Sequence, residues 1–187
     1  MNKKTLGLLC MIGGGTYLIV GIKFLMNRVP SNELIDLILS TLWSFGGICG
    51  ILGLLAERAT GENRIVRGIS YLPIVAFLLN IAGNVVQVFN PGLEVNPLTF
   101  IALLLLAIGM LLVGFLTVFG KVWKGGRQFV PFLPALMPFV GMAIGSLVGI
   151  VGGVNVSLVA ISWILLGFVV FSYGEAFTTS PIANIGD

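Results

Sequence analysis

The chain has 187 residues, of which 57% are hydrophobic and 9% are charged, and its formal net charge is +3. Soluble domains carry about 25% charged residues, so this composition excludes an ordinary water-soluble domain. The chain contains no histidine, which removes the commonest general base and metal ligand. Its cations flank apolar segments and do not alternate with stacking aromatic residues, so we expect no nucleic-acid partner.

Run length predicts that the chain crosses a membrane. About 20 mainly apolar residues, at 1.5 Å each, cross a hydrocarbon core of about 30 Å. Six segments pass this test: Thr5–Met26, Leu37–Ala56, Ile69–Phe89, Leu98–Gly120, Phe132–Val154 and Val156–Ala176. They leave almost no sequence over. The sequence therefore predicts an all-α membrane protein, a six-transmembrane-helix bundle forming a single integral membrane domain over residues 1–187, with the lipid bilayer as its surroundings.

The first predicted helix has a charged start and an apolar run, as a signal peptide does. The run continues to Met26 without a small-residue cleavage site, so we expect an uncleaved helix. Cys10 in this helix and Cys49 in the second are interpreted as small buried hydrophobes rather than a disulfide or metal ligands. We therefore expect no metal site and no cofactor.

Polar side chains concentrate on the third predicted helix and on the segments expected beside it. Asn80, Asn84 and Gln87 are spaced by four and three residues, which places their amides on one helix face. An unpaired amide facing lipid is costly, so this face must look into protein or water. Two interpretations stay open. Amide–hydroxyl bonds between helices could fix their register, or the outer half of the bundle could hold a polar pocket for a small neutral or zwitterionic ligand, with the candidate residues Asn80, Asn84, Gln87, Ser44, Ser162 and Trp163.

Three pairs of segments suggest an internal repeat. Residues 15–28 resemble 108–121, residues 42–53 resemble 136–147, and residues 69–77 resemble 161–169, at offsets of 93, 94 and 92. Near-constant offsets favour a duplication, with halves at 5–90 and 97–177. Because each half would hold an odd number of spans, the halves would be inverted, a 3+3 arrangement. The alternative is coincidence among Leu- and Gly-rich helices.

Glycine recurs at every fourth position of the fifth predicted helix. Residues four apart share a face, and a missing side chain lets another helix approach closely. We interpret the glycines of the second and fifth helices as packing positions and expect these two helices to meet at the centre, with a tight turn near residues 153–155 before the sixth helix. Such a face could be a bundle seam, a homodimer contact, a sliding surface or a pore wall. The predicted packing glycines are Gly46, Gly50, Gly141, Gly145, Gly149 and Gly153.

The basic residues predict the orientation of the chain. Lysine and arginine in alternate loops divide into eight on one side (Lys3, Lys4, Arg58, Arg64, Arg67, Lys121, Lys124 and Arg127) and two on the other (Lys23 and Arg28). Cytoplasmic loops carry the excess of such residues. We expect a multi-pass protein of the cell (inner) membrane with both termini in the cytoplasm.

The residues that the chain lacks exclude several classes of function. No acidic pair lies within a span, and neither a phosphate-binding glycine loop nor a nucleophile elbow occurs, so an enzyme is not expected. The first hypothesis is a non-enzymatic accessory or assembly subunit that packs against itself, as a homo-oligomer, or against other membrane subunits through glycine-lined faces. The alternative is a small solute transporter or substrate-binding membrane component with a polar pocket in the outer half.

Overall fold

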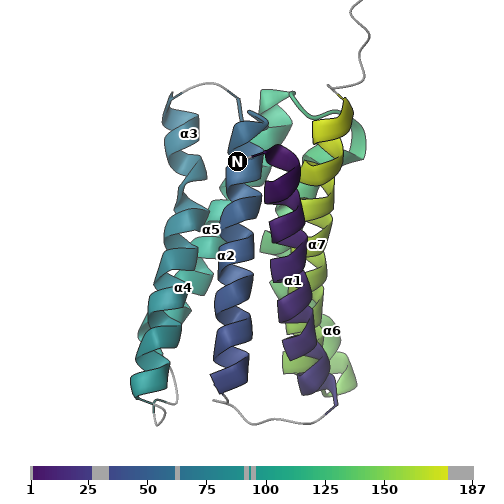
Figure 1. The fold of residues 1–187 in the computed structure, drawn as a ribbon. Helices are drawn as coiled ribbons and strands as arrows, with labels where there is room; N and C mark the ends of the chain where they lie inside the picture. Colours follow the sequence, from purple (N-terminus) through teal and green to yellow (C-terminus); the bar gives the residue numbers. More distant parts are fainter. Residues whose placement is uncertain (1, 27–33, 62–63, 91–92, 94–95, 177–187) are drawn as a thin grey trace, which may run out of the picture.

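The computed structural model of the chain describes residues 2–26, 34–61, 64–90, 93 and 96–176. Arg28 and residue 177, which the sequence predictions included, lie outside the described residues. The described elements are α1 (Lys3–Leu25), α2 (Leu34–Ala56), α3 (Arg64–Ser70), α4 (Leu72–Phe89), α5 (Pro97–Gly120), the 3-10 helix η1 (Gly125–Phe132), α6 (Leu133–Val148) and α7 (Val151–Ala176). Figure 1 shows their axes running along one common direction, with connections at the two ends.

Within the described residues, six helical segments are long and apolar enough to span a membrane. They are Lys3–Leu25, Leu34–Ala56, Arg64–Phe89, Pro97–Gly120, Gly125–Val148 and Val151–Ser172. The third joins α3 to α4 across Tyr71, and Pro73 stands in the first turn of α4, where its missing N–H costs nothing. The fifth joins η1 to α6. This confirms the predicted all-α class with six long apolar helices.

The helices form a ring in chain order. Helix α1 packs against α2, α2 against α4, α4 against α5, α5 against α6 and α6 against α7, and α7 returns to α1 and closes the ring. The tightest pairing is that of α1 with α7, and the α5–α6 pairing is sparse. The expectation that the second and fifth spanning helices meet at the centre is wrong, because α2 and α6 lie apart on this ring.

The turn between the last two spans comes earlier than predicted. Helix α6 ends at Val148, and Gly149 follows in the left-handed region with φ of 75°. Glycine adopts this conformation without a Cβ penalty and commonly terminates helices there. The amide of Ile150 then bonds the carbonyl of Gly145 at 2.9 Å, and α7 begins at Val151. Gly149 is thus a helix end, and Gly153 belongs to a different helix from Gly141 and Gly145.

The predicted packing glycines therefore serve three separate contacts. A Cβ on Gly141 or Gly145 would lie 2.5 Å from a Cα atom of α7, that of Asn155 or Val151. On α2, a Cβ on Gly46 would lie 2.6 Å from the Cα of Gly13, and one on Gly50 would lie 2.6 Å from the Sγ of Cys10. A Cβ on Gly153 would instead lie 2.7 Å from the backbone nitrogen of Leu25 on α1.

The closest helix pairing, α1 with α7, depends on small residues of both helices, which on α1 recur at every seventh position. Gly7, Gly14 and Gly21 on α1 meet the backbone of α7 around Gly167, Ala160 and Ser157, at 2.5 to 3.1 Å from an added Cβ. In a membrane the hydrophobic effect offers helices little reason to associate, so close backbone approach and the dispersion contacts it allows supply the attraction. These small residues fix where α1 lies.

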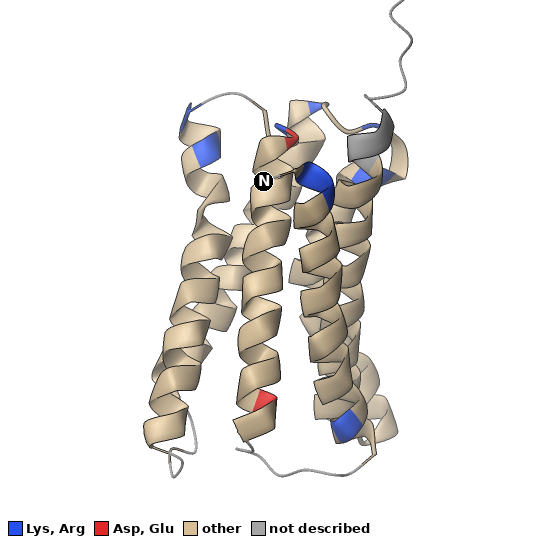
Figure 2. Cartoon of the chain, viewed as in Figure 1, with Lys and Arg blue, Asp and Glu red and all other residues tan. Residues whose placement is uncertain are grey.

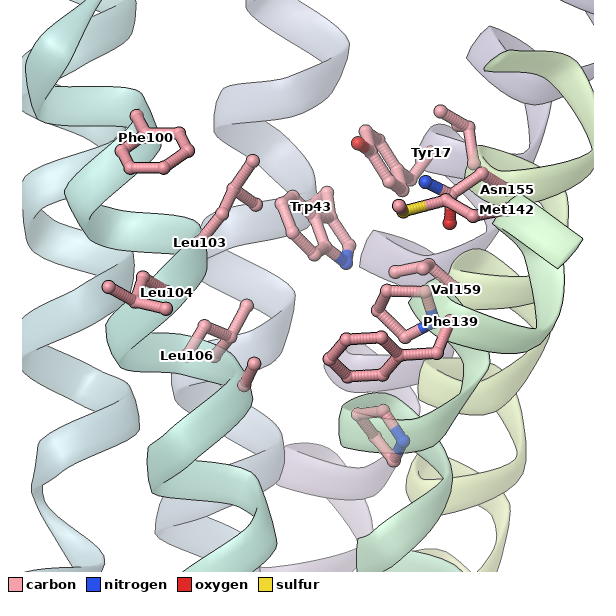
Figure 3. A pocket seen from close by; sticks show the side chains of 14 residues that line it. Tyr17, Trp43, Phe100, Leu103, Leu104, Leu106, Phe139, Met142, Asn155 and Val159 are labelled. Atoms are coloured by element: carbon pink, nitrogen blue, oxygen red, sulfur yellow. The ribbon is translucent and has the colours of Figure 1, made fainter. Parts of the chain in front are cut away.

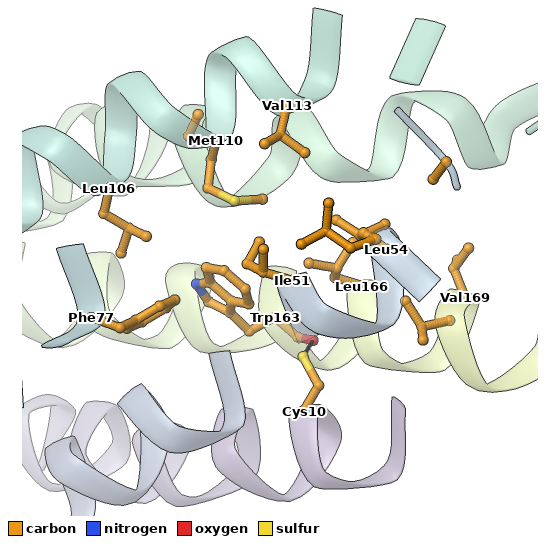
Figure 4. Packing of buried hydrophobic residues seen from close by; sticks show 14 of the residues in the cluster. Cys10, Ile51, Leu54, Phe77, Leu106, Met110, Val113, Trp163, Leu166 and Val169 are labelled. Carbon is orange, nitrogen blue, oxygen red and sulfur yellow. Dashed lines mark hydrogen bonds between the residues drawn. The ribbon is translucent and has the colours of Figure 1, made fainter. Parts of the chain in front are cut away.

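Larger side chains fill the interior of the ring, as Figure 4 shows. Leu54, Met110 and Leu166 from α2, α5 and α7 are buried together. The thiol of Cys10 donates to the carbonyl of Trp163 at 3.3 Å, and neither cysteine is in a disulfide. Large apolar residues also cover the outside, where Leu147 is 87% exposed. Hydrophobicity thus does not separate inside from outside in this bundle, as expected for a protein surrounded by lipid.

Charged residues gather at the two ends of the bundle and leave its middle bare (Figure 2). The end where α1 begins and α2 finishes carries the basic residues predicted for one side, together with an ion pair of Lys3 Nζ with Glu57 Oε1 at 3.2 Å. The opposite end carries Lys23, whose Nζ lies 2.6 Å from Asp36 Oδ1. The Lys23–Asp36 pair joins α1 to α2, and the Lys3–Glu57 pair joins α1 to the residue that follows α2.

Candidate ligand-binding cavity

The amides predicted on the third span bind hydroxyl groups of the second. Asn80 Nδ2 donates to Ser44 Oγ at 2.9 Å, and Asn84 Nδ2 donates to Thr41 Oγ1 at 3.0 Å and to Ser40 Oγ at 3.2 Å. Each amide nitrogen therefore crosses from α4 to α2. This ladder agrees with the interpretation in which polar pairs hold the register of two neighbouring helices.

The remaining predicted pocket residues are not brought to the same place. Gln87 Nε2 donates to the carbonyl of Leu93 at 3.2 Å beyond the end of α4. Ser162 Oγ turns back to its own helix and donates to the carbonyl of Val159 at 2.6 Å. Trp163 is fully buried against the ring of Phe77, 5.0 Å away between centroids. The structure thus joins Asn80, Asn84 and Ser44 and leaves the other three apart.

A cavity of about 340 Å³ lies elsewhere, between α5 and α6, with α1, α2 and α7 behind it. None of the six predicted pocket residues lines it. Phe100 on α5 and Phe139 on α6 are 64% and 63% exposed, whereas Trp43 at the back is 1% exposed. The cavity therefore opens sideways through the outer surface of the ring (Figure 3). Its lining residues are Tyr17, Trp43, Phe100, Leu103, Leu104, Leu106, Ala107, Pro134, Pro138, Phe139, Met142, Asn155, Val156 and Val159.

The opening arises because α6 leans on two different partners along its length. Just before α6 begins, Phe132 at the end of η1 packs on α5: Gly114 faces its ring, and the ring of Phe115 meets it edge to face at 5.0 Å. Toward the other end, Gly141 and Gly145 draw α6 onto α7. Helix α6 cannot follow both α5 and α7 over its whole length, so a gap remains beside α5.

The walls of the cavity are apolar, and its polar groups lie on the side formed by α1, α2 and α7. Trp43 Nε1 is buried and has no hydrogen-bond partner among the described residues, and the same holds for Asn155 Oδ1. Figure 3 shows the hydroxyl of Tyr17 and the amide of Asn155 directed toward the cavity. A buried N–H or amide oxygen without a partner costs free energy, and a ligand that displaced the side chains covering these two atoms would supply the missing partner.

Stacked aromatic rings hold these polar groups in place. Tyr17 stacks on Trp43 with ring centroids 4.2 Å apart and planes 10° from parallel. Behind them, Phe77 and Trp163 contact Trp43 edge to face, at 5.2 and 6.5 Å. Interlocked rings have little rotamer freedom, so the polar back of the cavity is preorganised.

Sequence reasoning missed this cavity because its polar residues follow no spacing rule. Tyr17 and Trp43 are single aromatic residues in separate apolar helices, and Asn155 was assigned to the final turn. The structure places Asn155 inside α7, in its second turn. The unusual feature that could have pointed to it is an amide at the start of an otherwise apolar span.

Comparisons with protein-family models, with curated proteins and with solved structures found no match for this chain.

Proposed function

We propose that this polytopic membrane protein is non-enzymatic and binds an uncharged, lipid-soluble molecule in the cavity between α5 and α6. One observation carries the proposal: a cavity of about 340 Å³ that opens sideways through the apolar surface and has unpartnered polar atoms at its back. Ligand sites are apolar concavities of about 300–1,000 Å³ with a few placed polar groups, and this cavity fits that description.

The position of the opening indicates the route of the ligand. The exposed rim side chains Phe100, Leu104 and Phe139 belong to the surface that the bilayer would cover. A molecule dissolved in the hydrocarbon region could enter without crossing a polar layer. Among the residues that the structure describes, none of those lining the cavity is charged, so a charged ligand would lose its hydration without compensation. An uncharged molecule that partitions into lipid is the better fit.

The glycine contacts bear on the first hypothesis from the sequence, that of an assembly subunit. Gly46, Gly50, Gly141, Gly145 and Gly153 all contact other helices of the same chain. Glycine faces that are already covered offer no free surface to a second protein. The contacts that first suggested an assembly subunit therefore support intramolecular packing, and the cavity supports ligand binding instead.

We further propose that the protein lies in the cell membrane with both termini in the cytoplasm. The described lysine and arginine residues gather at the end where α1 begins, with Lys23 at the opposite end. Short loops that carry an excess of lysine and arginine lie on the cytoplasmic side in most membrane proteins, which supports this orientation. In this orientation the mouth of the cavity lies in the outer half of the membrane, because Phe100 follows the start of α5 and Met142 approaches the end of α6.

Thermal unfolding in lipid nanodiscs tests the binding proposal, with decylbenzene as an apolar probe. The probe should raise the unfolding temperature of the wild-type protein in a saturable way. Ala107→Phe places a ring in the cavity and should abolish that rise. Ala143→Phe is the matched control, because Ala143 is exposed on α6 and does not line the cavity. Equal responses of the two variants would show that the probe acts through the bilayer and would overturn the proposal.

A further inference from the structure

We infer that the ligand of this cavity is a flat, uncharged ring bearing a carbonyl group, with an alkyl tail that leaves between α5 and α6. This inference rests on the proposed binding function and names the chemistry that the site would select. It draws on three features of the lining: the kind of polar group present, the aromatic rings and the shape of the opening.

The polar groups at the back of the cavity are mainly hydrogen-bond donors. The indole Nε1–H of Trp43 can only donate, the amide of Asn155 carries two N–H donors beside its oxygen, and the hydroxyl of Tyr17 donates as readily as it accepts. The Oδ1 of Asn155 is a buried acceptor that α6 covers, since a Cβ on Gly141 would lie 3.0 Å from it, so the N–H groups are the part of this amide available to a ligand. Trp43 is 1% exposed, and its Nε1 has no partner among the described residues. The complement of several donors is an acceptor with more than one lone pair, which a carbonyl oxygen supplies.

Neighbouring side chains cover the indole nitrogen of Trp43, which is inaccessible to water. The rim side chains are better able to move, because Phe139 and Met142 are 63% and 48% exposed. A ligand that displaces rim side chains could reach the nitrogen without disturbing the stacked rings behind it. The hydroxyl of Tyr17 and the N–H groups of Asn155, on residues that line the cavity, would meet the carbonyl first.

Aromatic rings favour a flat ligand over a flexible chain. Tyr17 and Trp43 present a stacked pair from the back, and Phe100 and Phe139 stand at the two sides of the mouth. Planar rings gain from edge and face contacts with aromatic side chains beyond the gain from area alone. Cavities of about 150 Å³ hold a benzene molecule. The volume of about 340 Å³ therefore has room for a substituted ring and the first carbons of a tail.

The lateral opening gives the alkyl tail of the ligand a way out of the cavity. Leu103 and Leu104 of α5 line the cavity and are 46% and 53% exposed, so a chain leaving the cavity would pass over them into the hydrocarbon region. A carboxylate or phosphate head group would find no cation among the lining residues. Such a head group would keep its charge outside the cavity. The site thus selects a neutral ring carbonyl compound, of which an alkylated quinone is the simplest form.

Three matched probes test the inference in nanodiscs by the concentration that half-saturates the rise in unfolding temperature. The first is trimethyl-decyl-1,4-benzoquinone, whose fully substituted ring cannot add to thiols. The second is the trimethyl-decylbenzene of the same outline without carbonyls, and the third is a straight-chain methyl ketone of similar length. We expect the quinone to bind at least about fivefold more tightly than either of the other two, because each added hydrogen bond is worth roughly a factor of two to ten.

Tyr17→Phe is the informative variant, because it removes the hydroxyl and leaves the ring that stacks on Trp43. It should weaken quinone binding severalfold while arene binding stays unchanged, and unchanged arene binding also shows that the variant is folded. Asn155→Leu should act in the same direction.

The possible failures are distinguishable from one another. Equal binding of quinone and arene would overturn the ring carbonyl inference and leave the proposed function standing. Tighter binding of the straight-chain ketone than of the quinone would contradict the preference for a flat ring. If both variants bound the quinone as tightly as the wild-type protein does, the quinone would bind outside this cavity, and the inference would be overturned. No binding of any probe would overturn the proposed function as well.

Discussion

The two sides of the helix ring are built differently. On the side of α1, α2 and α7, backbones touch: a Cβ on Gly13 would lie 2.6 Å from the Cα of Gly46, and one on Gly7 would lie 2.7 Å from the carbonyl oxygen of Gly167. On the opposite side, α5 and α6 converge at one end and leave a cavity of about 340 Å³ along the rest of their length. On the first side, glycines let the helix backbones come into contact, and on the second side a cavity separates the helices.

The difference shows what decides packing when lipid surrounds the protein. Apolar side chains are equally at home inside and outside, so burial alone does not close a seam between helices. A seam closes where small residues recur on both partners at matching positions, as on α1 and α7. The α5–α6 seam has Gly114 near its closed end and bulky Phe100, Leu104 and Phe139 at its mouth.

The largest effect is expected where a side chain is forced into a backbone contact. Gly13→Leu would push α1 and α2 apart, since its Cβ already lies 2.6 Å from the Cα of Gly46. We expect a loss of about 2–3 kcal/mol in the free energy of unfolding, in the range for overpacked positions. Denaturation in mixed micelles measures it. Gly15→Leu is the matched control, because a Cβ there meets nothing within 4 Å. Leucine is the better helix former at both positions, so equal losses would contradict a cost that comes from the contact with α2.

The open seam should respond in the opposite direction. Ala107→Phe would place a ring in the empty cavity of the ligand-free protein. We expect a stabilisation of about 1 kcal/mol, because filling a void restores dispersion contacts. Chemical denaturation without added ligand checks it, with Ala143→Phe on the exposed side of α6 for comparison. Destabilisation by Ala107→Phe alone would show that α5 and α6 close tightly in the bilayer.

The hydrogen bonds between α2 and α4 should contribute less than the glycine contacts. A double-mutant cycle of Asn80→Ala and Ser44→Ala isolates the 2.9 Å bond between their side chains. The expected coupling is about 0.6 kcal/mol, typical of such pairs in membranes. Gln87→Ala should cost less than Asn80→Ala, because Gln87 bonds a carbonyl beyond the end of its helix. A larger cost for Gln87→Ala would contradict the register role assigned to the ladder.

A similarly small effect is expected at the ion pair at the end away from the chain start. Lys23 and Asp36 retain 27% and 17% side-chain exposure while 2.6 Å apart. Water and salt screen such a pair, so Asp36→Asn should cost about 0.2–1 kcal/mol, less at high salt. Unfolding at two salt concentrations would measure it, and a cost that does not change with salt would indicate a packing role for Asp36.

The fold class could be predicted from the sequence because a bilayer imposes a length rule on apolar helices. Each of the six predicted spans corresponds to a helical segment. Helix neighbours could not be predicted from the row of glycines, because the same residue served as a packing position at Gly145 and a helix end at Gly149. The recurrence of small residues at every seventh position in α1, facing small residues of α7, carried the contact information instead.

The candidate site was predictable only in part. Spacing placed Asn80 and Asn84 on one face and correctly indicated a protein neighbour for that face, since both bond to α2. Spacing could not place Tyr17, Trp43 and Asn155 together, because they come from three helices whose order around the ring depends on backbone contacts. The 3+3 repeat and the orientation of the termini stay predictions.

The most direct test of the central claim, that one seam of the ring is open to the bilayer, uses the fluorescence of Trp43. A variant with Trp123→Phe and Trp163→Phe leaves Trp43 as the single tryptophan, buried to 1% exposure at the back of the cavity. In nanodiscs of phospholipid brominated along the acyl chains, Trp43 should be strongly quenched, and Ala107→Phe should relieve the quenching. Quenching that is absent, or that Ala107→Phe leaves unchanged, would contradict an opening between α5 and α6.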